Sequence, residues 1–283
     1  MTPIVAVHGV GHHAPAHSPQ DIVAGRSRRW SEDLAQGLGL PPEHLDLCYA
    51  YYADHLHAGR PTAQGGTEDD AALDRLELDD PSAATLAADW AEALGLPRAT
   101  AQGRLAVPLR HLAGMVAEHL SLDGRLTRAF IATLFRDVAR YLGDPKARAA
   151  ARETIAEAIR ARRARIVIAH SLGSVVTYEA LHAHPELEVD LLLTLGSPLA
   201  LPHGVFHRLS PAPEDGTGRR PPGVRRWVNI SDHGDPVAVP RPLSRRFPDV
   251  DEDLTESISL FDFHTAARYL RSAAVATAVR AHL

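Results

Sequence analysis

The chain contains a single cysteine, Cys48, so its sequence allows no internal disulfide. An unpaired cysteine agrees with a reducing compartment. No window of roughly 18 or more apolar residues is present, and we therefore expect no transmembrane segment. The first predicted strand begins at Ile4, which leaves no room for a signal peptide and leads us to expect a cytoplasmic protein.

The chain also has no excess of positive charge. The formal net charge is −5, and Lys146 is the only lysine. Nucleic-acid binding requires a basic surface, so we expect no nucleic-acid partner. The chain has 283 residues, of which 45% are hydrophobic and 23% charged. That is sufficient for one large α/β domain with an insertion, or for two smaller domains.

Short apolar runs alternate with helical patterns along much of the chain. This order is typical of an α/β fold with a mostly parallel β-sheet flanked by helices. Helices are predicted from about 21 to 38 and from 265 to 283, and residues 240–256 are predicted to form a loop. The predicted strands are 4–7, 45–52, 166–169, 189–195 and 224–230.

Residues 59–162 differ from the rest because, after a polar loop, they show helical periodicity without a convincing strand. We expect residues 1–58 and 163–283 to form the core and 59–162 to form a mostly helical cap insertion. Two apolar stripes, at 105–120 and 126–142, then predict a covered, partly apolar pocket that prefers small to medium acyl esters to charged substrates. The alternative is that these stripes only pack against each other and the sheet.

The segment Arg165–Ser174, RIVIAHSLGS, has the most informative local pattern. An apolar run ending at Ala169 predicts a buried parallel strand, and helical spacing resumes after Gly173. A serine between strand and helix, with small residues two positions before and after it, is typical of a nucleophile elbow. Ala169 stands where glycine is usual, which is a mild departure. We expect Ser171 to be a nucleophile; the alternative is an incidental serine in an ordinary loop.

A serine nucleophile needs a general base, and that base needs an acid to fix its tautomer. Asp232 and Asp235 both follow the last predicted strand. Asp235 is favoured because a proline and apolar residues after it can anchor the turn. His264 follows an apolar segment and directly precedes the last predicted helix, so it is the predicted base rather than an ordinary helix-terminal histidine. His233 is too close to the acids in sequence to reach the elbow.

The oxyanion formed during acyl transfer must face backbone N–H groups. Leu172 directly follows the predicted nucleophile at a helix N-terminus, where the helix dipole favours negative charge. The second donor is expected in the segment after the first strand, where glycines let the backbone turn sharply. That segment is His8, Gly9, Val10 and Gly11, with Val10 as the favoured donor.

Together these motifs resemble an α/β-hydrolase of the lipase/esterase type that begins at the strand carrying the oxyanion motif. The resemblance implies a catalytic triad of Ser171, His264 and Asp235 and no cofactor. It implies hydrolysis of a carboxylic ester or related acyl bond of a small-molecule or lipid-like substrate through an acyl-enzyme. His8, Gly9, Gly11, His170, Gly173 and Asp232 are expected to support the site. The matching segments are Val7–Gly11, Ala169–Gly173, Leu195–Pro198, Trp227–Asn229, Asp235–Val237 and His264.

Other readings remain open at this point. Thioesterases and peptidases use the same triad, and a non-catalytic binding or regulatory protein can keep the fold. A homo-oligomer is compatible with all of these. The histidines near the N-terminus also suggest a metal site, but Pro15 argues against a helix that would align His13 with His17. The glycines after the first strand are not followed by the Gly-Lys-Ser/Thr of a phosphate-binding loop.

Overall fold

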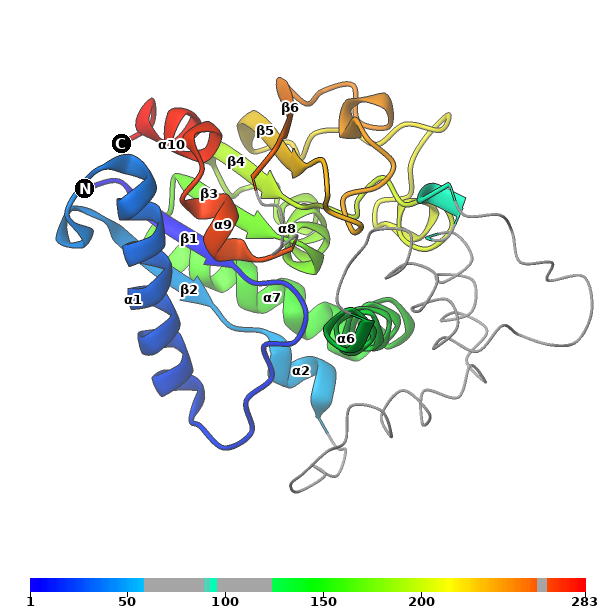
Figure 1. Ribbon diagram of the computed structural model, residues 1–283, viewed down its shortest axis with the longest axis horizontal. Coiled ribbons are helices and arrows are strands. Elements are labelled where there is room, and N and C mark those ends of the chain that lie inside the picture. The colour runs from blue at the N-terminus through cyan, green and yellow to red at the C-terminus, as the bar shows by residue number, and fades with distance from the viewer. Residues whose placement is uncertain (59–89, 91, 96–123, 259–263) are drawn as a thin grey trace, which may run out of the picture.

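The computed structural model describes residues 1–58, 90, 92–95, 124–258 and 264–283. Its described part forms one six-stranded sheet in the order β2-β1-β3-β4-β5-β6, in which every neighbouring pair is parallel (Figure 1). The predicted α/β class with a mostly parallel sheet is therefore confirmed. The strands are β1 (Pro3–Val7), β2 (Asp46–Ala50), β3 (Ile166–His170), β4 (Val189–Leu195), β5 (Val224–Asp232) and β6 (Glu252–Glu256).

Helices cover both faces of the sheet, as the alternation of buried side chains requires. In β1, Ile4 and Ala6 pack in one apolar cluster with α1, α9 and α10. Val5 and Val7 point the other way, into a cluster with α6, α7 and α8. The helices are α1 (Pro19–Leu38), α2 (Ala53–His57), α6 (Gly124–Gly143), α7 (Pro145–Arg162), α8 (Leu172–Ala183), α9 (Ala266–Leu270) and α10 (Ala273–Arg280).

The start of α1 is encoded locally. The Ser18 hydroxyl accepts a hydrogen bond from the backbone N–H of Asp21 at 3.1 Å, and Pro19 occupies the first turn. The helix ends at Gly39, whose φ of 66° favours glycine. Because Ser18 and Pro19 start α1 shortly after the loop that follows β1, the beginning of the helix lies close in sequence to the carboxyl end of that strand.

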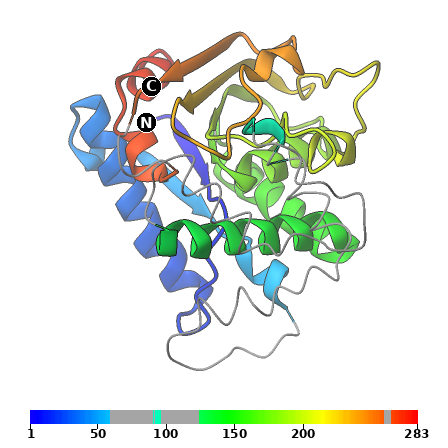
Figure 2. The same ribbon diagram turned by 45° about the vertical axis from the view of Figure 1, so that its right-hand side comes forward.

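Of the predicted insertion, the structure describes α6, α7 and a few residues near Trp90. Helix α7 packs against β1, β2 and α8, as part of the layer that covers the sheet. Helix α6 passes beside the loop after β1 (Figure 2). Asp137 of this helix accepts a hydrogen bond from the backbone N–H of Gly11 in the loop. Leu134 and Val138 on α6 are buried in the core. The stripe at 105–120 and the side chains of Leu126 and Phe130 lie outside the described residues.

Two predictions about the last third of the chain were wrong. Residues 252–256, predicted as loop, form the edge strand β6, which pairs with β5. Its polar sequence EDLTE is only partly buried, so it lacks the apolar pattern of an internal strand; Asn229 donates to Asp253 across the pair at 2.8 Å. The predicted single C-terminal helix is two helices. Helix α9 ends at Leu270, and the Ser272 side chain caps the start of α10.

No helix in the described ranges is both long and apolar enough to span a membrane.

Candidate active site

The carboxyl ends of four adjacent parallel strands meet at one edge of the sheet. The loop His8–Gly11 follows β1, Ser171 follows β3, Gly196 follows β4, and Asp235 lies beyond β5. In open α/β sheets this edge is where ligands bind. The fold therefore gathers into one place the residues that the sequence motifs single out.

Ser171 joins β3 directly to α8 in a strained backbone conformation. Its φ of 54° and ψ of −131° are rare for any residue other than glycine, and such conformations cost on the order of 1–3 kcal/mol. The backbone on either side holds this geometry. The Ser171 N–H donates to the Leu195 carbonyl at 2.9 Å, and its own carbonyl accepts from the Ser174 hydroxyl at 2.6 Å. The turn is thus fixed by neighbouring strand and helix together.

Two glycines let the loop after β1 approach this turn. A Cβ added to Gly173 would lie 2.3 Å from the His8 carbonyl oxygen, and one added to Gly9 would lie 2.6 Å from the Ser171 Cβ. Neither distance is sterically allowed. Ala169, in contrast, is accommodated as a fully buried residue of β3. The close packing therefore depends on Gly9 and Gly173 and tolerates a methyl group at Ala169.

Asp235 and His264 form a buried pair. The His264 Nδ1 lies 2.7 Å from the Asp235 Oδ2, and the carboxylate also accepts hydrogen bonds from the Val237 N–H at 2.8 Å and the Tyr269 hydroxyl at 2.7 Å. A carboxylate only accepts hydrogen bonds, so this contact assigns the donor to Nδ1 of His264, the tautomer whose lone pair is on Nε2. Gly196, with φ of 56°, leaves room for the pair: a Cβ there would lie 2.6 Å from the Asp235 Oδ2.

Asp232 has a different environment. Its two carboxylate oxygens accept hydrogen bonds from the backbone N–H groups of Gly234 at 2.7 Å and Ile258 at 2.9 Å, which fixes the turn after β5. Its own N–H donates to the Tyr269 hydroxyl at 2.8 Å. Tyr269 thereby links the turn to Asp235. Burial, and then the Asp235 charge, raise the pKa of Tyr269, so its hydroxyl stays protonated.

The loop after β1 is held from two sides. His8 is fully buried, its Nε2 accepts the Tyr52 N–H at 3.2 Å, and its ring stacks on Tyr52 with a centroid distance of 4.1 Å. Burial lowers the pKa of His8 well below its usual value, so the ring is neutral and its Nδ1 donates to the Gly9 carbonyl. On the far side the Gly11 N–H donates to Asp137 at 3.0 Å. Val10 lies between these two anchors.

His170 lies directly before Ser171 in the sequence and, like Ser171, lines the cavity that is described below. Its ring is buried, and within the described parts of the chain neither ring nitrogen has a hydrogen-bond partner. Its centroid lies 4.6 Å from that of His264. Burial, and then the neighbouring His264, lower the pKa of His170 well below its usual value, so this ring is neutral.

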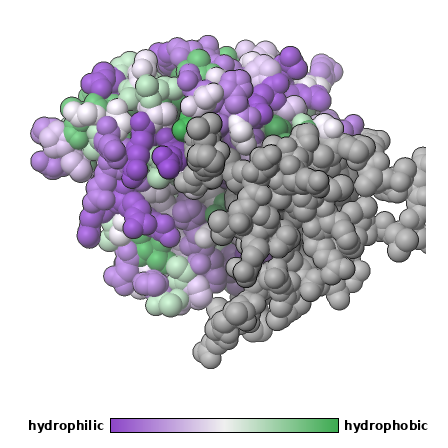
Figure 3. All heavy atoms as spheres, in the orientation of Figure 1, coloured by the Kyte–Doolittle hydropathy of each residue, from purple (hydrophilic) through white to green (hydrophobic). Residues whose placement is uncertain are grey.

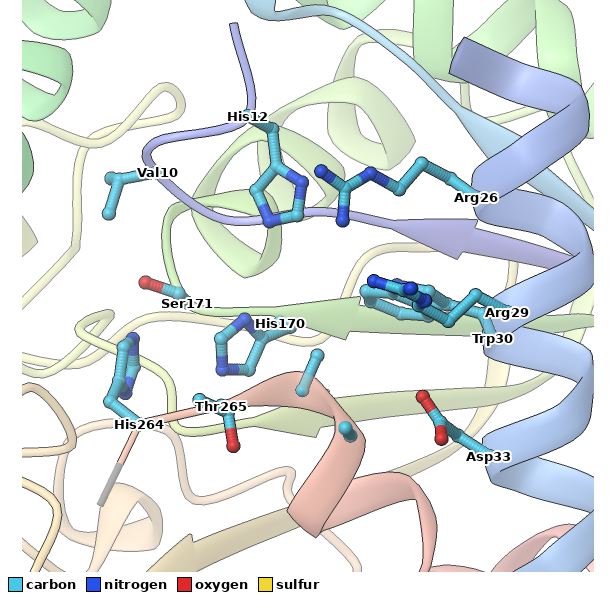
Figure 4. A pocket seen from close by; sticks show the side chains of 12 residues that line it. Val10, His12, Arg26, Arg29, Trp30, Asp33, His170, Ser171, His264 and Thr265 are labelled. Carbon is cyan, nitrogen blue, oxygen red and sulfur yellow. The ribbon is translucent and has the colours of Figure 1, made fainter. Parts of the chain in front are cut away.

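A cavity of about 320 Å³ opens beside Ser171 (Figure 4). One wall comes from the loop after β1, a second from the turn at Ser171, and a third from the start of α9. The fourth wall is α1, which contributes Arg26, Arg29, Trp30 and Asp33. The apolar lining expected from the insertion is not what borders this cavity in the described residues, because Leu134 packs in the core instead.

Sequence reasoning missed the α1 wall entirely. The signal was present: positions 26, 29, 30 and 33 fall on one helical face, and the helix follows the predicted oxyanion segment directly. This signal is hard to interpret, because charged residues on one face of an amphipathic helix usually form a solvated surface.

Comparisons with protein-family models, with curated proteins and with solved structures find no match to this chain. What the site can do is therefore argued from its geometry.

Proposed function

We propose that this protein is a serine hydrolase that cleaves a carboxylic ester or a related acyl bond through an acyl-enzyme intermediate. The observation that carries the proposal is the strained turn at Ser171 beside the buried Asp235–His264 pair. Non-glycine residues at positive φ concentrate at functional sites, and a serine held between strand and helix is the arrangement of a nucleophile elbow. On this proposal the fold is an α/β-hydrolase fold.

The proton route is proposed from the Asp235–His264 hydrogen bond and from the position of His264 on the cavity that Ser171 also lines. His264 Nε2 takes the Ser171 proton as Oγ attacks the substrate carbonyl, and Asp235 stabilises the imidazolium that forms. Collapse of the tetrahedral intermediate transfers that proton to the leaving group and leaves an ester on Ser171. Water, deprotonated by the same nitrogen, then attacks the ester and releases the acid. Asp235 stays ionised throughout, with the Tyr269 hydroxyl and the Val237 N–H donating to it.

The oxyanion would be stabilised by the backbone N–H groups of Leu172 and Val10. Leu172 is the first residue of α8, where the helix has N–H groups without helical partners. Val10 lines the cavity with Ser171 and lies between the two anchored ends of its loop. In the view of Figure 4 the Ser171 hydroxyl lies between Val10 and the His264 ring. Its Oγ has no hydrogen-bond partner among the described residues, which leaves it available to a substrate.

The test is a panel of p-nitrophenyl esters of graded acyl length, run beside acyl thioesters and aminoacyl anilides. We expect turnover of at least one acyl class, with a burst of product equal to the enzyme concentration where deacylation is slow. Ser171→Ala should remove both the burst and the turnover, and Ser210→Ala, an exposed serine, should remove neither. A folded wild-type protein that turns over none of the three classes would instead favour the non-catalytic binding protein.

A further inference from the structure

The cavity beside Ser171 has two arginines on one wall. Arg26 and Arg29 extend from α1 toward the side of the cavity that holds His12 and His170 (Figure 4). Among the described residues, neither guanidinium forms an ion pair or a hydrogen bond. Arginines that line a cavity and make no contact with a protein carboxylate have their five donors available for a ligand.

The other charged and titratable groups of this wall leave the excess positive. Asp33 also lines the cavity, but its Oδ1 accepts two hydrogen bonds from Arg271, at 2.6 and 2.9 Å. His12 is neutral near pH 7, since burial, and then the Arg26 charge, lower its pKa to about 4. Its Nδ1 lies 2.7 Å from the Tyr49 hydroxyl. The chain as a whole carries a net charge of −5, so this positive site is a local departure from the overall balance.

We propose that Arg26 and Arg29 form an anion-binding subsite, so that the substrate hydrolysed at Ser171 carries a carboxylate or phosphate group. This inference rests on the proposed function and names its substrate class. Guanidinium groups bind both anions through paired, charge-assisted hydrogen bonds. A cavity of about 320 Å³ suits a small acidic metabolite better than a long lipid chain. Hydrophilic residues also dominate the surface over α1 in Figure 3.

The alternative is that both arginines are solvated residues of a surface helix, and Arg29 is indeed exposed. The helix offers a matched control. Arg28 is exposed on the same turn but does not line the cavity. Changing each of the three to glutamine removes the same charge and leaves a similar length of side chain.

The experiment compares kcat/KM for three esters that share a six-carbon acyl chain. Ethyl hexanoate is neutral, ethyl hydrogen adipate carries a carboxylate on the acyl side, and the hexanoate of 2-hydroxyethyl phosphate carries a phosphate on the alcohol side. We expect at least one charged ester to exceed the neutral one by about tenfold or more, as a charge-assisted hydrogen bond allows. Whichever charged ester is hydrolysed faster shows whether the acyl side or the alcohol side of the scissile bond faces α1.

In Arg26→Gln and in Arg29→Gln this charged-to-neutral ratio should fall about tenfold, and in Arg28→Gln it should stay at the wild-type value. Added salt should lower the ratio as well, since partly exposed charges are screened. A wild-type ratio near one, or a ratio that is the same in all four proteins, would overturn the anion subsite while leaving ester hydrolysis at Ser171 intact.

A binding measurement separates this inference from a failure of the proposed function. Calorimetric titration of Ser171→Ala with adipate should detect binding that weakens about tenfold with Arg26→Gln added and is unchanged with Arg28→Gln added. Binding of this kind in a protein that hydrolyses nothing would support the subsite and refute the hydrolase. Absence of adipate binding, together with neutral-ester turnover, would do the reverse.

Discussion

Removal of the Tyr269 hydroxyl tests how the site is held together. The hydroxyl donates to Asp235 at 2.7 Å and accepts the Asp232 N–H at 2.8 Å, and the side chain is 1% exposed. In Tyr269→Phe both groups lose a partner in a place that water does not reach. A buried donor left unsatisfied costs about 1–3 kcal/mol, and a hydrogen bond to a charged group about 1.5–3 kcal/mol. The free energy of unfolding should therefore fall by about 2.5–6 kcal/mol.

The same change should alter catalysis in a direction that a merely structural role would not. Without the hydroxyl, the negative charge on Asp235 Oδ2 is shared with His264 alone, so the imidazolium is held more tightly. The acid limb of the kcat/KM profile against pH should consequently move to higher pH. The assay is denaturant unfolding together with ester hydrolysis across pH.

A control with the same chemistry lies elsewhere in the fold. Tyr141 on α6 is fully buried and donates to Glu179 of α8 at 2.6 Å, and neither residue lines the cavity beside Ser171. Tyr141→Phe should lose about 1.5–3 kcal/mol, because it gives up one hydrogen bond to a charged group, and it should leave the acid limb in place. If both variants shift the limb equally, or if Tyr269→Phe leaves it unchanged, then Tyr269 does not act through Asp235 and the reasoning is refuted.

Two further substitutions test the acid and the elbow. Asp235→Asn should lower kcat by on the order of 10⁴ through loss of tautomer control, with an unchanged fold by circular dichroism, whereas Asp232→Asn should cost activity less. A reversed order would make Asp232 the acid. Gly173→Ala should remove most activity, because the new Cβ would lie 2.3 Å from the His8 carbonyl oxygen and push away the loop after β1. Steady-state kinetics on a purified, folded variant check this, and near wild-type kcat would show that the loop can yield.

The internal strands could be predicted from the sequence because parallel strands buried on both faces read as unbroken apolar runs. Ser171 could be singled out because it directly follows such a run and has small residues two positions before and after it. The edge strand β6 could not, since only one side of it is paired and its residues are polar. The double role of Tyr269 could not either, because nothing in its sequence neighbourhood indicates that it contacts two residues more than 30 positions away.

The cavity wall was the least predictable part of the site. Its arginines lie on a helix whose other face packs in the core, and the path of the chain after β1 brings them to the cavity that Ser171 also lines. The apolar stripes of the insertion predicted a substrate pocket, but Leu134 and Val138 are buried in the protein core. Apolar periodicity identifies what is buried and does not say whether it is buried against protein or ligand.

The central claim is that Ser171 is a nucleophile, and covalent labelling tests it most directly. A fluorophosphonate probe should form one adduct per chain, and peptide mass mapping should place it on Ser171. Ser171→Ala should give no adduct, and prior incubation with a turned-over ester should slow labelling of the wild type. An adduct on another residue, or a wild-type protein that stays unlabelled while folded, would contradict the account.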